Sequence, residues 1–89
     1  MDNREVITEC LKYIDPSRCD YMEWCQVGMA LKVEGFDCEV WDEWSRKDDR
    51  YREGDCERKW NTFGKIGVTG ATIVKMAKDN GWETQNKHK

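Results

Sequence analysis

The sequence predicts an all-α fold, a compact bundle of about four to five short helices. Apolar residues recur at helical spacing through most of the chain, and helix-starting residues alternate with helix-ending glycines. No alternation of apolar and polar residues is long enough to predict a strand. Five tryptophans among 89 residues supply the core, because each indole hides about 150 to 250 Å² when buried.

Two helices are expected in the first part of the chain. The first stops before Pro16, since the residue before a proline avoids helical geometry. The second is the central helix, and a capping box of Asp20 and Glu23 is expected to start it. Gly35 ends it. Gly28, in its middle, costs about 1 kcal/mol relative to alanine, so we expect it to admit a neighbouring helix or a tryptophan ring.

Three further helices follow. Asp37 is expected to cap the third, which ends at Arg46 and Lys47, and residues 48–54 form a loop. Asp55 is expected to cap the fourth, with its apolar stripe at Cys56, Trp60 and Phe63.

Thr69 is expected to cap the fifth helix, because threonine is a good N-cap. Gly81 suits the left-handed residue after that helix, and Trp82 is expected to pack back onto its last turn. We expect residues 1–82 to form a single domain and residues 83–89 to be a disordered polar tail.

The aromatic residues divide into core and surface candidates. We expect four tryptophans to be mainly buried, with Trp44 at the margin of the core. Tyr51 lies in the predicted loop and is the ring most expected to be exposed. The four buried candidates are Trp24, Trp41, Trp60 and Trp82.

The net charge of −3 is unevenly distributed. Residues 1–45 carry four basic and eleven acidic groups, whereas residues 46–65 carry seven basic and five acidic groups. A basic segment on an acidic protein can meet a phosphate backbone, although the overall field would not steer nucleic acid strongly. We therefore expect any such binding to be weak, no better than micromolar, and strongly dependent on salt.

The usual catalytic constellations are missing from the sequence. It has no phosphate-binding loop and no His-Glu-x-x-His motif, and its only histidine is His88 in the polar tail. We expect no catalytic residue, no bound metal and no cofactor. We also expect that the chain is not an enzyme by itself. With no signal peptide and no apolar run of membrane length, the sequence predicts a cytoplasmic protein with no membrane partner.

Cations interleaved with aromatic residues make residues 46–60 the candidate nucleic-acid-binding segment. Cations that hold phosphates and rings that stack on bases are the parts of a single-strand binding surface. The alternative is that the tryptophans belong to the core and the cations are ordinary surface charge. The candidate binding residues are Arg46, Lys47, Arg50, Tyr51, Arg52, Arg58 and Lys59.

Four phrases follow one another in order between about Tyr21 and Trp82. They are Trp24-Cys-Gln-Val-Gly28-Met-Ala-Leu-Lys32, Trp41-Asp-Glu-Trp44-Ser45-Arg46, Tyr51 followed by Cys56-x-x-Lys59-Trp60-x-x-Phe63, and Thr72-Ile73 through Ala77-Lys-x-x-Gly81-Trp82. Together they resemble the second type of primase C-terminal domain, a helical module of phage and plasmid primases and primase-helicases.

The resemblance implies an accessory role in DNA replication, beside a primase domain and often a helicase domain of a larger parent protein. It implies help in engaging template single-stranded DNA or a nucleotide during primer synthesis. The alternative is an interdomain or protein-protein docking module, for which the acidic first half is suited. Hydrolysis of nucleoside triphosphates then resides in the neighbouring helicase domain. A self-contained nucleotide hydrolase is a third and weaker hypothesis, because a phosphate loop and a general base are both missing.

We predict that all five cysteines, at positions 10, 19, 25, 38 and 56, are reduced. Their number is odd and no Cys-x-x-Cys pair occurs. Alkylation under denaturing, nonreducing conditions followed by intact-mass measurement should therefore add five labels. Three labels or fewer would refute this prediction.

Overall fold

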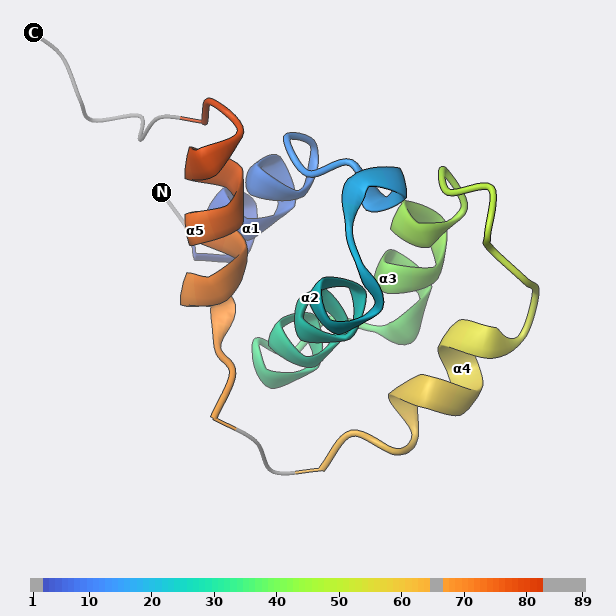
Figure 1. Ribbon diagram of the computed structural model, residues 1–89. Helices are drawn as coiled ribbons and strands as arrows, with labels where there is room; N and C mark the ends of the chain where they lie inside the picture. The colour runs from blue at the N-terminus through green and yellow to red at the C-terminus, as the bar shows by residue number, and fades with distance from the viewer. Residues whose placement is uncertain (1–2, 65–66, 83–89) are drawn as a thin grey trace, which may run out of the picture.

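The computed structural model describes residues 3–64 and 67–82, and these residues form an all-α fold (Figure 1). Their α-helices are α1 (Asn3–Leu11), α2 (Tyr21–Val33), α3 (Cys38–Ser45), α4 (Asp55–Trp60) and α5 (Gly70–Asp79). A short 3-10 helix, η1 (Pro16–Arg18), precedes α2. The fold class predicted from the sequence is confirmed.

Helix α2 is the central element. It packs against α3 and α4 on one side and against α5 on the other, while α1 packs mainly on α5 (Figure 1). The predicted capping box is present, because the Glu23 amide donates to the Asp20 carboxylate at 2.8 Å and the Asp20 amide donates to the Glu23 carboxylate at 3.0 Å. The chain turns away at Gly35, whose φ of +89° suits glycine.

Gly28 lets the Trp41 indole lie directly on the α2 backbone. A Cβ atom at position 28 would stand 2.5 Å from Trp41 Cε2, closer than two carbon atoms can pack. The expected role of this glycine is therefore confirmed. With no side chain in the way, Trp41 is fully buried (0% exposed).

Trp41 is also the centre of an aromatic cluster. Its ring centroid lies 4.4 Å from that of Trp24, 5.9 Å from Trp60 and 5.4 Å from Phe63. Aromatic pairs at these separations contribute about 0.5 to 1.5 kcal/mol each beyond the area that they bury. The cluster joins α2, α3 and α4.

The predicted ranking of the other tryptophans is partly wrong. Trp44 is buried rather than marginal, at 4% exposed, because its Nε1 donates to the Ile14 carbonyl at 2.9 Å. Trp24 and Trp60 are only partly buried, at the open side of the cluster. Trp82 is buried as expected.

Helices α1 and α4 are shorter than predicted. Helix α1 ends at Leu11, and single turns carry the chain on to the buried Ile14. Helix α4 is preceded by Gly54 in the left-handed conformation, so Asp55 lies in its first turn rather than at its cap. Phe63 lies beyond the end of α4 and is buried nevertheless.

Lys32 of α2 closes the C-terminal end of α4. Its Nζ donates to the carbonyls of Trp60 at 2.8 Å and Phe63 at 3.0 Å. An unpaired helix carbonyl near the core is costly, and a lysine ammonium satisfies two acceptors at once. This contact between α2 and α4 is not visible in the sequence, because 28 and 31 residues separate the partners.

Helix α5 begins and ends as the sequence predicts. The Thr69 hydroxyl accepts from the Ala71 amide at 3.3 Å, and Gly81 has a φ of +105°. The Trp82 amide donates to the Ala77 carbonyl at 2.9 Å, which with the bond from the Gly81 amide to the Lys78 carbonyl completes a Schellman motif. The predicted polar tail, residues 83–89, lies outside the described residues.

Alanine at position 28 should lower the free energy of unfolding by about 1 to 3 kcal/mol, the usual cost of overpacking a core. This loss should exceed the gain in helix propensity, since the Trp41 ring is fully buried and cannot move aside. Urea unfolding followed by circular dichroism measures it. The control is Gly64→Ala, whose Cβ meets no atom within 4 Å. A Gly28→Ala protein as stable as the control would contradict the packing described.

Candidate nucleic-acid interface

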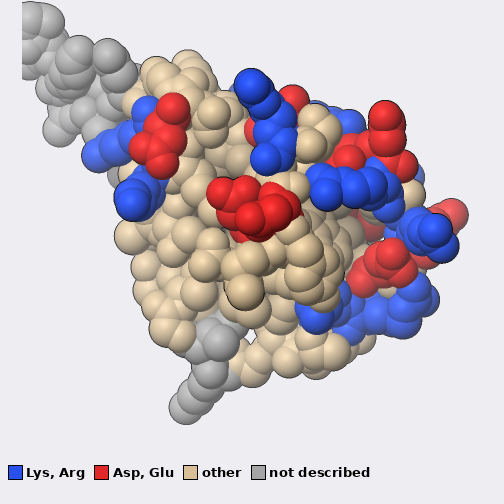
Figure 2. All heavy atoms as spheres, in the orientation of Figure 1, with Lys and Arg blue, Asp and Glu red and all other residues tan. Residues whose placement is uncertain are grey.

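The seven candidate binding residues run from the end of α3, through the connection of residues 46–54, into α4. Figure 2 shows basic and acidic side chains alternating over this side of the molecule. Three of the six cations form ion pairs, Arg46 with Asp42, Arg50 with Asp48 and Arg58 with Asp55. The three cations without a carboxylate partner among the described residues are Lys47, Arg52 and Lys59.

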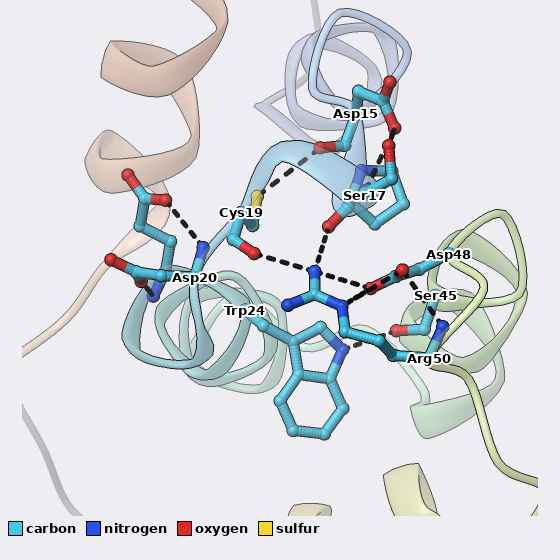
Figure 3. Close-up of polar contacts among 10 residues, drawn as sticks. Asp15, Ser17, Cys19, Asp20, Trp24, Ser45, Asp48 and Arg50 are labelled. Atoms are coloured by element: carbon cyan, nitrogen blue, oxygen red, sulfur yellow. Dashed lines mark hydrogen bonds and ion pairs between the residues drawn. The ribbon is translucent and has the colours of Figure 1, made fainter.

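Arg50 holds the connection after α3 against η1. Its Nη2 donates to the Pro16 carbonyl at 3.2 Å and to the Cys19 carbonyl at 2.8 Å, while its Nε donates to the Asp48 carboxylate at 2.9 Å (Figure 3). The hydrogen bond from the Arg50 side chain to Asp48 lowers the pKa of the Asp48 carboxyl. With its donors turned to the protein, Arg50 positions the loop.

Tyr51 is not the exposed ring that its place in a loop suggests. Its side chain is half-buried, and its hydroxyl donates to Asp42 Oδ1 at 2.8 Å. The Arg46 guanidinium lies over the ring, 4.9 Å from its centroid. One face of the ring is therefore occupied, and the expectation that Tyr51 is an exposed ring is wrong.

Tyr21 is the exposed ring instead. It begins α2 and is 62% exposed, because the first turn of that helix projects beyond the core. The Lys59 ammonium lies 5.2 Å from its centroid, and the Trp24 ring lies 5.8 Å away at an angle of 41°. Helical spacing puts Tyr21 on the same face of α2 as Trp24, Gly28 and Leu31, so its exposure is not legible in the sequence.

A pocket of about 180 Å³ opens between the start of α2, the connection after α3, and α4. Aromatic side chains line it together with three carboxylates and two guanidinium groups. Trp24 is fixed in this lining because its Nε1 donates to the buried Ser45 hydroxyl at 2.8 Å (Figure 3). The lining residues are Asp20, Tyr21, Trp24, Ser45, Asp48, Arg50, Tyr51, Arg52, Asp55 and Cys56.

The pocket thus combines three of the seven predicted residues, Arg50, Tyr51 and Arg52, with two that the prediction omitted, Tyr21 and Trp24. The other four, which are Arg46, Lys47, Arg58 and Lys59, do not line it. The lining comes from two stretches, residues 20–24 and 45–56, which are distant in sequence, so residue spacing does not reveal the pocket.

Three of the thiols are poor nucleophiles. Burial raises the pKa of Cys10, Cys19 and Cys56 to about 11, which leaves little thiolate at neutral pH. All five cysteines are free thiols. Within residues 3–64 and 67–82, no group of three or more histidine, cysteine, aspartate or glutamate side chains is placed to hold a metal ion.

None of the described helices is long and apolar enough to cross a membrane.

The bond to Asp42 raises the pKa of Tyr51 to about 12 from an ordinary value near 10. Because the folded-state pKa is the higher one, this bond stabilises the fold fully below about pH 10, and the contribution disappears as the pH rises through about 12. The stability difference between the protein and its Tyr51→Phe variant should therefore shrink between these two pH values. Thermal unfolding across that range measures it.

The absorbance at 295 nm gives a second readout. The difference between the titration curves of the protein and the Tyr51→Phe variant isolates the phenol of residue 51. A midpoint near pH 10 in that difference would contradict the bond to Asp42.

A model of the family described as primase C terminal 2 matches residues 7–77 of the 89-residue chain. No curated protein and no solved structure matches the chain. The matched segment takes in all of α2, α3 and α4 together with most of α1 and α5. The resemblance carried by the four tryptophan-containing phrases is thereby confirmed, and the chain belongs to the primase C-terminal 2 family.

Proposed function

We propose that this chain is a noncatalytic module of a DNA primase or primase-helicase, and that it engages template single-stranded DNA during primer synthesis. The observation that carries the proposal is the aromatic pocket with Arg52 at its edge. Rings for stacking and cations for phosphates are the two elements of single-strand binding. Membership of a primase family supplies the biological setting.

The charge pattern favours a short, weak contact. Only three candidate cations lack a carboxylate partner among the described residues, and two of them, Arg52 and Lys59, flank the pocket or its exposed ring. Each phosphate contact contributes to the salt dependence of binding. The module therefore adds a local grip on a strand that other domains of the parent protein also hold.

The absence of activity in the module itself is part of the proposal. Burial raises the pKa of the Cys19 and Cys56 thiols, and the sequence has no phosphate-binding loop. Hydrolysis of nucleoside triphosphates and extension of primers are assigned to neighbouring domains of the parent protein.

A docking role is the second candidate. Tyr21 and Met22, adjacent in the first turn of α2, are 62% and 63% exposed. Neighbouring large apolar side chains at the surface are features of protein interfaces. If these two residues contact a primase or helicase domain, single-stranded DNA should leave their resonances unchanged.

Chemical-shift mapping with an oligonucleotide tests the proposal. Addition of single-stranded DNA at low salt should shift the resonances of Tyr21, Trp24 and Arg52 before those of α1 and α5. No shifts at high DNA concentration, or shifts confined to α1 and α5, would remove the DNA-binding role and favour docking.

The Arg52→Gln variant should lower the affinity, and it should reduce the slope of log affinity against log salt by about 1. Binding at about 50 and about 200 mM salt measures the slope. Lys75→Gln is the matched control, since Lys75 is an exposed cation on α5, away from the pocket. Equal effects of the two substitutions would indicate nonspecific attraction rather than a site.

A further inference from the structure

We infer that the pocket is a receptor for one unstacked base of the strand, that it prefers a base with an exocyclic amino group, such as cytosine, over thymine, and that it does not hold a nucleoside triphosphate. The inference rests on the proposed function, because it specifies how the same site reads a single strand. Nothing in the family assignment specifies the pocket or its ligand.

The size of the pocket limits what it can contain. Sites for drug-sized ligands usually enclose about 300 to 1,000 Å³. The cavity here is about 180 Å³, enough for one planar ring system but not for a base, sugar and phosphates together. A base can enter it only if the sugar and phosphates stay outside, as they do when one base turns out of a strand.

The walls suit a flat, apolar-faced guest. Tyr21 and Trp24 meet at 41° and form an angled wall, and the Trp24 ring is held by its hydrogen bond to Ser45 and its contact with Trp41. In Figure 3 the Trp24 indole lies beside the Arg50 side chain, with its N–H turned toward Ser45. A rigid wall loses little side-chain freedom when a base stacks on it.

The polar groups of the lining determine which base edge fits. Asp48 is fully engaged by Arg50, but Asp20 and Asp55 each use only Oδ1 in their contacts. Their Oδ2 atoms have no hydrogen-bond partner among the described residues, so two carboxylates of the lining can still accept a hydrogen bond. An amino group can donate to them. The corresponding carbonyl oxygen of thymine would face these carboxylates instead of a donor, since we assign the Arg52 guanidinium to a phosphate of the strand.

The balance of charge excludes a triphosphate. The lining contains three carboxylates and two guanidinium groups, so it is net negative, and one of those guanidinium groups, Arg50, is held by Asp48 and two backbone carbonyls. Arg52 is left to meet one phosphate of a strand. Binding sites for triphosphates bring several cations and a metal ion to the phosphate chain.

The test compares fluorescently labelled oligocytidine and oligothymidine of about ten nucleotides by anisotropy. The protein should bind oligocytidine at least about fivefold more tightly, the discrimination of a single base contact. The double variant Asp20→Asn, Asp55→Asn should bring the two affinities to within about twofold, because an amide can also donate to thymine. Asparagine at position 20 still caps α2, so the variant should fold.

Tyr21→Ala should weaken binding of oligocytidine by about fivefold or more, and Tyr13→Ala, another exposed tyrosine, should not. Deoxycytidine triphosphate should not displace oligocytidine when the two are present at comparable concentrations. If both oligonucleotides bind equally well, or if the triphosphate competes as well as oligocytidine, the pocket inference is overturned while DNA binding stands. If neither oligonucleotide binds, the proposed function fails as well.

Discussion

The contact between Gly28 and the Trp41 indole is the constraint on which the rest of the structure depends. Because position 28 has no Cβ, the large Trp41 indole lies flat on the central helix and is removed from water. From that position Trp41 contacts Trp24 of α2, Trp60 of α4 and Phe63 beyond it. One small residue therefore sets the distance between α2 and α3 and, through the ring cluster, the place of α4.

The pocket is a consequence of that packing. Trp24 stacks on Trp41 and is fixed by Ser45, so its remaining surface faces outward between the start of α2 and the loop after α3. Arg50 holds that loop against η1. Much of the positive charge in this segment is therefore part of the architecture. The cation left for a ligand at the pocket is Arg52.

Local signals predicted well the features that depend on neighbours in sequence. The capping box at Asp20 and the Schellman motif at Gly81 are made of residues a few positions apart, so their chemistry is legible in order along the chain. The burial of Trp44 could not be predicted from its neighbours in sequence, because its hydrogen-bond partner, the Ile14 carbonyl, lies 30 residues away. The place of Tyr51 in a loop predicts an exposed ring, but Asp42 binds its hydroxyl and Arg46 lies over its ring. The pocket forms only where residues 20–24 meet residues 45–56, which no periodicity reveals.

The most direct test of base binding in the pocket is a search for intermolecular nuclear Overhauser effects between oligocytidine and the aromatic ring protons of the protein. Contacts are expected from the cytosine H5 and H6 protons to the rings of Tyr21 and Trp24, since a base in the pocket stacks between these rings and the loop. Contacts found only to α1 or α5, or none at saturating oligonucleotide, would contradict base binding in the pocket.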